Sequence, residues 1–317
     1  MFSTKTLGGF FIFHDKINKQ NSITLDNQGG QSVISGKTKL AGFFANPAEH
    51  SLSPRMHNRG FQACGVDAVY LAFEVDQTNL ARAIESIRTL DMLGVNLSMP
   101  NKTTAIAYVD ELSQEAQLIG AINTIVNQNG KLIGYNTDGI GFVKAMAETA
   151  KIKIKDKKIT ILGAGGAAKA ITVQAALEGA REVVLYKRKN ERFLTVKRDF
   201  EKIGEQTDSI VRVVDYADEE QLVRDLQTSE LLVNATDIGM GTKEGQSPLA
   251  KATFLHENLF VIDLIYSPRK TQLLKEAEKI GAPAFNGLGM LLYQGATAFH
   301  LWTNHEMPLD IMKDLFE

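Results

Sequence analysis

A glycine-rich segment, Ile159–Ala170 (ITILGAGGAAKA), has the residue types and the spacing of a phosphate-binding loop. An apolar run typical of a buried strand leads into the glycines, and a helical pattern follows them. Gly163, Gly165 and Ala168 fit the G-x-G-x-x-A spacing, which permits a tight turn, lets a pyrophosphate approach the backbone and lets helix and strand pack closely. The free N–H groups at the start of the helix attract phosphates. A dinucleotide is therefore expected here, and a glycine-rich turn without a ligand is the alternative. The expected cofactor contacts of the loop are Gly163, Ala164, Gly165, Gly166 and Ala167.

The type of dinucleotide is read at the end of the next strand, roughly 20 residues further along the chain. An acidic residue at that place binds the 2′-hydroxyl of NAD, whereas basic residues accommodate the 2′-phosphate of NADP. The sequence there is Tyr186–Asn190 (YKRKN), in which Lys187 and Arg188 are basic and no acid is present. This segment favours NADP, although the following Glu191 leaves NAD open.

Several polar motifs lie outside this loop, at the ends of expected strands or in tight turns. Ligand contacts of an open α/β sheet gather at such places. The motifs are HSLSP (50–54), NLSMPNK (96–102), GAINT (120–124), GYNTDG (134–139) and NGLGMLLYQGA (286–296). They predict a polar site for a small molecule.

The elements that must position these motifs alternate between short strands and amphipathic helices. This βαβ alternation predicts an α/β fold with parallel sheets that helices cover on both faces. The expected strands are Leu40–Ala45, Val69–Val75, Gly94–Leu97, Ile122–Val126, Leu132–Gly134, Ile159–Leu162, Glu182–Tyr186, Ile210–Val214, Leu231–Asn234 and Phe260–Leu264. The expected helices are Met56–Cys64, Leu80–Leu90, Gly139–Ala150, Ala167–Glu178, Arg192–Ile203, Glu219–Leu226 and Thr271–Ile280. The stretch 287–316 is expected to be helical, with Pro308 starting a last short helix.

The length of 317 residues predicts two domains, since a single core of that size is unusual. We expect a substrate-binding catalytic domain at 38–138, completed by C-terminal helices at 287–317. A Rossmann dinucleotide-binding domain is expected at 139–286, with the active site in the cleft between the two. Residues 1–37 are expected to be a loosely ordered extension.

Composition excludes several other classes of protein. The net charge of −2 argues against a nucleic-acid binder. The single Cys64 excludes an internal disulfide and fits a cytoplasmic location, and the six histidines have no metal-ligand spacing. No apolar run approaches the roughly 18 residues that a membrane span needs. We therefore expect no metal and no membrane or nucleic-acid partner. The expected oligomeric state is a monomer or a homodimer.

The motifs occur in the order SLSP, N-x-S-x-P-x-K, GA-x-NT, G-x-NTDG and GAGGAA, followed by NAT, YSP and GMLLYQGA. In this order the chain resembles the shikimate dehydrogenase family from about residue 38 to the C-terminus. The GMLLYQGA stretch and Leu301–Thr303 (LWT) are similar to the quinate/shikimate dehydrogenase subgroup. The resemblance implies reversible, NADPH-dependent reduction of 3-dehydroshikimate to shikimate, on the route to chorismate and the aromatic amino acids. Use of quinate, or of NAD, is the alternative.

The resemblance also implies roles for single residues. Lys102 would donate a proton to the reacting oxygen, and Asp138 would hold both this lysine and a ring hydroxyl. The implied substrate contacts are Ser51, Ser53, Ser98, Asn123, Tyr266 and Gln294. The implied cofactor contacts beyond the glycine loop are Lys187, Arg188, Asn190, Thr236 and Gly287.

The sequence departs from the family pattern in two places, and two alternative interpretations remain. Ser98 stands where the family often has Thr, and Lys187 and Asn190 replace the Asn and Asp of the subgroup's Asn-Arg-x-Asp stretch. Asp138 could instead cap the helix that follows it. A sensor that binds the ligand without turnover is the second alternative, although the presence of both Lys102 and Asp138 argues against it.

Overall fold

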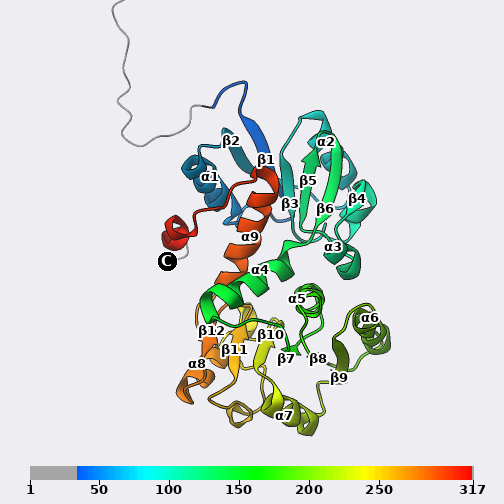
Figure 1. The fold of residues 1–317 in the computed structure, drawn as a ribbon, viewed down its shortest axis with the longest axis vertical. Helices are drawn as coiled ribbons and strands as arrows, with labels where there is room; N and C mark the ends of the chain where they lie inside the picture. Colours follow the sequence, from blue (N-terminus) through cyan, green and yellow to red (C-terminus); the bar gives the residue numbers. More distant parts are fainter. Residues whose placement is uncertain (1–33, 316–317) are drawn as a thin grey trace, which may run out of the picture. The chain divides into compact units, whose positions relative to one another are not determined.

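The computed structural model describes residues 34–315, which contain two six-stranded β-sheets (Figure 1). The first sheet precedes residue 136 and the second begins at residue 158. The strands of the first sheet are β1 (Lys39–Ala45), β2 (Ala68–Glu74), β3 (Gly94–Leu97), β4 (Glu111–Leu112), β5 (Thr124–Gln128) and β6 (Lys131–Tyr135). Its helices are α1 (Ser53–Cys64), α2 (Leu80–Thr89), the 3-10 helix η1 (Thr104–Tyr108) and α3 (Gln114–Ile119). Residues 1–33 of the expected N-terminal extension lie outside the described residues.

The first sheet has the order β2-β1-β3-β5-β6-β4 and is mixed rather than parallel. Strand β1 pairs parallel with β2 and β3, whereas β5 is antiparallel to both β3 and β6. The expectation of a parallel sheet is therefore wrong here. The antiparallel pairing of β5 with β6 follows from the two-residue turn Asn129–Gly130, where φ is 54° and 91°. An Asn-Gly pair with two positive φ values connects neighbouring antiparallel strands directly, without a crossover helix.

The second sheet is parallel throughout, with the order β12-β11-β10-β7-β8-β9. Its strands are β7 (Lys158–Leu162), β8 (Glu182–Lys187), β9 (Ile210–Asp215), β10 (Leu231–Asn234), β11 (Phe260–Asp263) and β12 (Ala284–Phe285). Two strand series that run outward from a central first strand are the Rossmann order, in which ligands bind beside the carboxyl ends of the strands. The expected α/β fold with a Rossmann half is confirmed.

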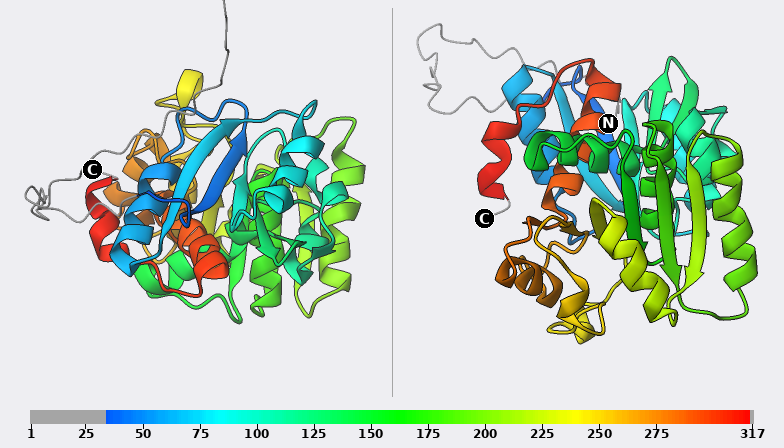
Figure 2. Two further views of the ribbon diagram at one scale, coloured as in Figure 1. Left: turned by 90° about the horizontal axis from the view of Figure 1, so that it is seen from above. Right: turned by 60° about the horizontal axis from the view of Figure 1, so that its bottom comes forward.

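Helices cover both faces of the second sheet, so its central strand β7 is buried along its whole length (Figure 2). One core cluster joins the sheet to α5 and α6, and another joins it to α7 and α8. These helices are α5 (Gly166–Leu177), α6 (Phe193–Glu205), α7 (Glu219–Thr228) and α8 (Gln272–Lys279), and two 3-10 turns, η3 (Gly241–Lys243) and η4 (Ala252–Phe254), lie between α7 and β11.

Two helices, α4 (Thr137–Ala145) and α9 (Leu288–Thr303), lie side by side in close contact (Figure 1). The two helices lie so close together that a Cβ at Gly141 would be 2.6 Å from the Gln294 backbone nitrogen, so this position requires glycine. Helix α4 continues as a π-helical segment, η2 (Met146–Ala150), and α9 is followed by the 3-10 helix η5 (Leu309–Leu315).

The last part of α9 packs against the first sheet. The Trp302 indole N–H donates to the Ile125 carbonyl at 3.0 Å, and Phe299 lies in the same core cluster as Trp302. The C-terminal chain thus returns to the first sheet, although the domain boundaries stay a prediction.

Most expected elements lie within two residues of their observed limits. The exceptions are α1, which begins three residues before the expected Met56, and the expected helical stretch 287–316, which is interrupted between Thr303 and Leu309. Helix α4 begins at Thr137 rather than Gly139, because Asn136 caps it. Lys102 lies in a turn before η1, which was not predicted. Helix α3 and the two-residue strands β4 and β12 were not predicted, because each is too short to show a period.

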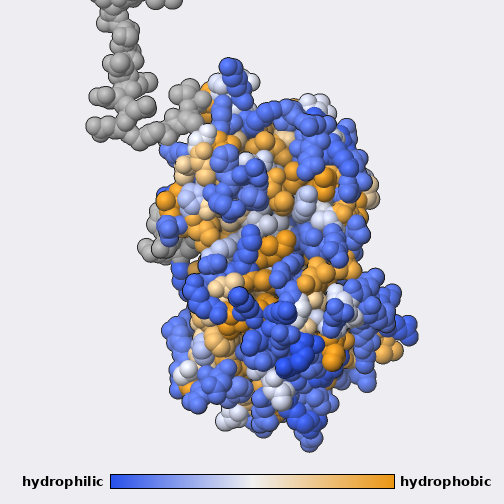
Figure 3. Space-filling view, viewed as in Figure 1, coloured by the Kyte–Doolittle hydropathy of each residue, from blue (hydrophilic) through white to orange (hydrophobic). Residues whose placement is uncertain are grey.

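No helix in residues 34–315 is long and apolar enough to cross a membrane. The face seen in Figure 3 is mostly hydrophilic, with apolar side chains exposed in patches across its middle.

Candidate active site

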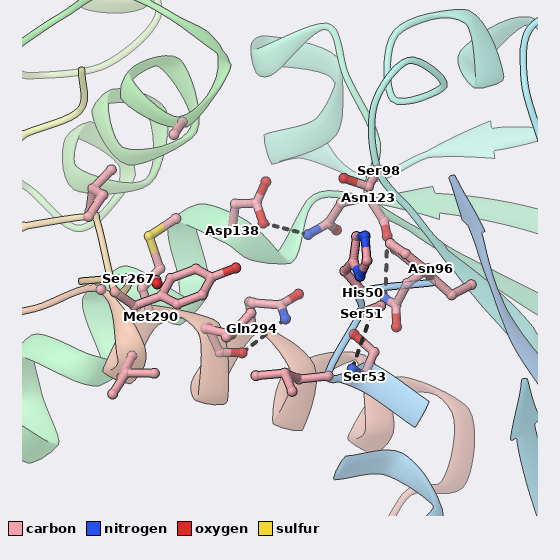
Figure 4. A pocket seen from close by; sticks show the side chains of 18 of the residues that line it. His50, Ser51, Ser53, Asn96, Ser98, Asn123, Asp138, Ser267, Met290 and Gln294 are labelled. Carbon is pink, nitrogen blue, oxygen red and sulfur yellow. Dashed lines mark hydrogen bonds between the residues drawn. The ribbon is translucent and has the colours of Figure 1, made fainter. Parts of the chain in front are cut away.

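A cavity of about 810 Å³ is lined by residues of the first sheet, by the chain that follows β11 and by α9 (Figure 4). All eight residues predicted to be catalytic or substrate-binding line it: Ser51, Ser53, Ser98, Lys102, Asn123, Asp138, Tyr266 and Gln294. Two predicted cofactor contacts, Ala167 at the start of α5 and Gly287 before α9, also line it. The other predicted cofactor contacts lie outside this lining. Motifs far apart in the sequence therefore share one cavity.

Lys102 and Asp138 form an ion pair within this cavity. The Lys102 Nζ lies 2.6 Å from the Asp138 Oδ2, and their side chains are 27% and 17% exposed. The preceding residue holds the lysine in place, because the buried Asn101 amide donates to the Val75 carbonyl at 2.7 Å and to the Phe44 carbonyl at 3.3 Å. A lysine on so firmly anchored a loop can present its ammonium to a bound molecule at a defined place.

The first turn of α4 presents Asp138 to the cavity. The helix cap is Asn136, whose Oδ1 accepts the Asp138 backbone N–H at 3.1 Å. The Asp138 carboxylate is therefore not used as the cap, and the capping alternative does not describe this structure. Its Oδ1 accepts the Asn123 Nδ2 at 2.8 Å, while its Oδ2 faces Lys102. Both carboxylate oxygens thus have a donor that fixes their direction.

The two serines of the SLSP motif sit where the chain after β1 turns into α1. The Ser51 Oγ accepts the Ser53 backbone N–H at 3.2 Å, which leaves the Ser51 hydroxyl hydrogen free to donate elsewhere. Figure 4 shows both serines on the same side of the cavity as Asn96. Pro54 lies in the first turn of α1, where a backbone N–H has no partner within the helix, so a proline costs no helical hydrogen bond.

The chain beyond the second sheet forms another wall of the cavity. Gln294 on α9 donates its Nε2 to the Leu291 carbonyl at 2.9 Å, so its Oε1 is the end that can accept from a bound molecule. Figure 4 shows Gln294 and Met290 across the cavity from Asn123. Tyr266 follows β11 and is 43% exposed. This wall therefore presents the polar groups of Gln294 and Tyr266 beside the apolar side chain of Met290.

Sequence reasoning missed several residues that line the cavity. Asn96 is the first residue of the N-x-S-x-P-x-K motif, so the motif itself was a signal. Ser267 belongs to the YSP motif and Met290 to GMLLYQGA. His50 and Leu52 lie in HSLSP, Leu97 lies in NLSMPNK, and Leu288 and Leu291 lie in NGLGMLLYQGA. Phe43, Pro47, Leu264, Arg269 and Leu315 gave no signal, since side-chain packing alone places them here. The missed residues are Phe43, Pro47, His50, Leu52, Asn96, Leu97, Leu264, Ser267, Arg269, Leu288, Met290, Leu291 and Leu315.

The glycine loop between β7 and α5 has the geometry that a pyrophosphate needs. At Gly163 φ is 106°, and a Cβ there would lie 2.8 Å from the Ala235 carbonyl oxygen, so this turn requires glycine. A Cβ at Gly165 or Gly166 would meet nothing within 4 Å. Ala168 is fully buried against the sheet. The open space over Gly165 and the N–H groups that begin α5 fit the phosphates of a dinucleotide.

The basic segment after β8 lies at the carboxyl edge of the same sheet. Arg188 and Asn190 are exposed, and Lys187 donates its Nζ to the Asn190 Oδ1 at 3.1 Å. Thr236 follows the neighbouring strand β10, and its methyl group would lie 3.2 Å from a Cβ at Gly163. These residues flank the glycine loop, as the expected cofactor contacts must. Among the residues described, no group of three or more His, Cys, Asp or Glu side chains could hold a metal ion.

A Rossmann-ordered sheet, an open glycine loop and a polar cavity beside it place the chain in the class of α/β dinucleotide-binding proteins. Residues 43–125 match the family model described as the shikimate dehydrogenase substrate binding domain. Residues 287–315 match the model described as the shikimate 5′-dehydrogenase C-terminal domain. A relative from Listeria monocytogenes named shikimate dehydrogenase (NADP(+)) is 45% identical over 282 residues, 89% of this chain and 97% of its own. The chain belongs to the shikimate dehydrogenase family, which confirms the resemblance.

Solved structures agree with this membership. The shikimate 5-dehydrogenase from Listeria monocytogenes, in complex with shikimate and NAD, has a TM-score of 0.88 and 45% identity, covering 92% of this chain and all of its own. The quinate dehydrogenase from Corynebacterium glutamicum, in complex with NAD, has a TM-score of 0.78 and 26% identity, covering 88% of this chain and 98% of its own. The greater similarity is to the shikimate enzyme.

Proposed function

We propose that this chain catalyses the reversible, NADPH-dependent reduction of 3-dehydroshikimate to shikimate. The observation that carries the proposal is the Lys102–Asp138 pair, at 2.6 Å, in a cavity that the start of the glycine-loop helix also lines. The name of the 45% identical relative supports both the reaction and the cofactor. The proposal also includes a role in chorismate and aromatic amino acid biosynthesis, as the family resemblance implies.

Lys102 is the proton donor in this proposal. When bound, NADPH supplies hydride to the carbonyl carbon. As negative charge develops on the carbonyl oxygen, the Lys102 ammonium stabilises it and transfers a proton to it, which completes the alcohol. Asp138 holds the ammonium in position. Since the lysine side chain is 27% exposed, water can return the proton after each turnover.

The remaining polar residues of the cavity orient the substrate. Ser51 and Ser53, joined by Tyr266, donate hydroxyl hydrogen bonds to the substrate carboxylate. The ring hydroxyls are bound by Asn123, Asp138 and Gln294, and Ser98 adds a further hydroxyl. A site of this kind discriminates against analogues that lack a hydroxyl, because its own polar groups would be left unpaired.

The residues around the glycine loop fit the cofactor. The N–H groups from Gly163 to Ala167 bind the pyrophosphate at the start of α5. Lys187, Arg188 and Asn190 bind the 2′-phosphate, and Thr236 and Gly287 flank the rest of the dinucleotide. The exposed position of Arg188 and Asn190 at the end of β8 supports this assignment.

Quinate oxidation, or a preference for NAD, is the alternative. The solved relative with shikimate bound also holds NAD, which keeps NAD in consideration. Quinate carries one more hydroxyl on the carbon that bears the carboxylate, so room near Ser51, Ser98 and Tyr266 decides between the substrates. The 26% identity to the quinate dehydrogenase, against 45%, favours shikimate.

An absorbance assay at the reduced-nicotinamide band tests the proposal directly. Shikimate and quinate are each combined with NADP⁺ and NAD⁺. We expect the highest kcat/KM for shikimate with NADP⁺. Silence in all four combinations would refute the proposal and favour a ligand sensor. A cytoplasmic location and a monomeric or homodimeric state stay predictions from the sequence.

A further inference from the structure

A chain of buried hydrogen bonds leads from the core of the first sheet to the cavity. The Tyr70 hydroxyl on β2 donates to the Asn96 Oδ1 at 2.8 Å. The Asn96 Nδ2 donates to the Thr124 Oγ1 at 3.0 Å, and the Thr124 hydroxyl donates to the Asn123 Oδ1 at 3.0 Å. Each donor therefore points toward the cavity.

The direction of this chain follows from the chemistry of its first member. Burial raises the pKa of the fully buried Tyr70 hydroxyl well above its usual value, so it stays protonated and can donate. Because Asn96 accepts this bond through its Oδ1, its amide nitrogen must face Thr124. A threonine hydroxyl carries one hydrogen, so Thr124, having accepted from Asn96, donates to Asn123.

This series of hydrogen bonds ends at the Lys102–Asp138 ion pair. The Asn123 Oδ1 accepts both the Thr124 hydroxyl and the Thr137 backbone N–H, the latter at 2.8 Å. With its oxygen occupied in this way, the Asn123 amide directs its Nδ2 to the Asp138 Oδ1 at 2.8 Å. The opposite orientation would set two oxygens against each other at this place.

We propose that Thr124 is a positioning residue: its hydroxyl, oriented by Tyr70 through Asn96, holds the Asn123 amide against Asp138. This inference rests on the proposed function. Thr124 is fully buried and does not line the cavity, so it acts on bound substrate through its hydrogen-bond partners Asn123 and Asn96, which do line it. Tyr70 is also fully buried and lies outside the lining.

The first test compares Thr124→Val with Thr124→Ser. Valine keeps the shape of threonine but removes the hydroxyl, whereas serine keeps the hydroxyl. We expect Thr124→Val to lower kcat/KM for shikimate about tenfold, which is the size of effect that loss of one buried hydrogen bond produces. The KM for NADP⁺ should stay within twofold of wild type. We expect Thr124→Ser to stay within twofold of wild type.

Thr160→Val is the matched control. Thr160 is a fully buried threonine of β7 whose hydroxyl pairs with the Ser229 hydroxyl at 2.8 Å, away from the cavity. Its loss should lower the thermal unfolding temperature without changing kcat/KM. If Thr124→Val and Thr160→Val affect kcat/KM equally, the effect on activity is one of general stability and the positioning role is wrong.

The second test measures the energetic coupling between Tyr70 and Thr124 along the hydrogen-bond series. Its Tyr70→Phe variant can also be measured if Thr124→Val folds poorly. Tyr70→Phe should lower kcat/KM for shikimate about threefold. In the double variant Tyr70→Phe/Thr124→Val the loss should not exceed that of Thr124→Val alone, because one path is already broken. Multiplying losses, or a Tyr70→Phe variant equal to wild type, would overturn the proposal. Since wild-type turnover is measured in the same assay, such a result would reject the positioning role alone and leave the proposed reaction intact.

Discussion

The Lys102 Nζ and the Asp138 Oδ2 are 2.6 Å apart although 36 residues separate them in the chain. The lysine lies in the loop after β3, and the aspartate lies in the first turn of α4. Neither element positions the pair alone. The hairpin β5–β6 carries the chain back to the edge of the cavity, so α4 begins opposite the loop that bears Lys102.

Replacement of Lys102 by alanine should lower kcat by about 10²–10⁴-fold, the usual contribution of a general acid, and change KM far less. Steady-state kinetics of shikimate oxidation measures both constants. Lys131→Ala is the control, because Lys131 pairs with Glu111 and both side chains are more than half exposed. Turnover of Lys102→Ala within threefold of wild type would show that this lysine is not the proton donor.

Gly165→Val should weaken dinucleotide binding without loss of stability. A Cβ at Gly165 would meet nothing within 4 Å, so the added methyl groups would occupy only the space that we assign to the pyrophosphate. We expect the KM for NADP⁺ to rise at least about tenfold, while the thermal unfolding temperature stays unchanged.

Gly163→Ala provides the contrast, because its Cβ would lie 2.8 Å from the Ala235 carbonyl at a φ of 106°. This variant should unfold at a lower temperature. An unchanged affinity of Gly165→Val for NADP⁺, measured by titration calorimetry, would place the cofactor elsewhere.

Arg188→Ala should weaken NADP⁺ and spare NAD⁺. The 2′-phosphate is the one group that distinguishes the two cofactors, and a guanidinium is well suited to bind it. We expect the kcat/KM ratio of NADP⁺ to NAD⁺ to fall at least about tenfold. Arg181→Ala, an exposed arginine before the opposite end of β8, is the control and should leave the ratio unchanged. Equal losses for both cofactors would reject the 2′-phosphate role.

Stability should fall in mild acid because of His57. This side chain is fully buried, its ring stacks on Tyr70 with centroids 4.5 Å apart, and neither ring nitrogen has a hydrogen-bond partner among the residues described. Burial lowers the pKa of His57 to about 3, an effect that the nearby Asn96 opposes only in part. Above its ordinary pKa of 6.5, His57 is neutral in the folded and unfolded chains alike, and it does not change stability with pH.

Between pH 6.5 and 3 only the unfolded chain takes up this proton, so the free energy of unfolding should drop as pH falls, by up to about 1.4 kcal/mol per pH unit. Denaturant unfolding of wild type and His57→Leu at about pH 7, 5.5 and 4.5 measures the two slopes across this window. The slope of His57→Leu should be shallower. Parallel curves for the two proteins would mean that His57 does not cause the acid sensitivity.

The fold of the dinucleotide-binding half could be predicted from local sequence patterns. In Ile159–Ala170 a strand, a glycine turn and a helix follow each other within twelve residues, so sequence spacing and spatial spacing agree. The Rossmann order of the second sheet then follows from repeated βαβ units, whose handedness is nearly invariant. The antiparallel β5 and β6 were not foreseen, although Asn129–Gly130 was a signal for a hairpin.

The residue types of the candidate site are also a property of the sequence. The sequence motifs contain every residue of the hydrogen-bonded chain except Tyr70, and all eight predicted catalytic and substrate-binding residues line the cavity. Amino-acid types, turn geometry and helix starts are local, so the sequence by itself determines them. Which side chains meet was decided by tertiary structure alone: the Lys102–Asp138 contact and the bond from Tyr70 to Asn96 join elements whose separation depends on strand order and packing, and no local period encodes either.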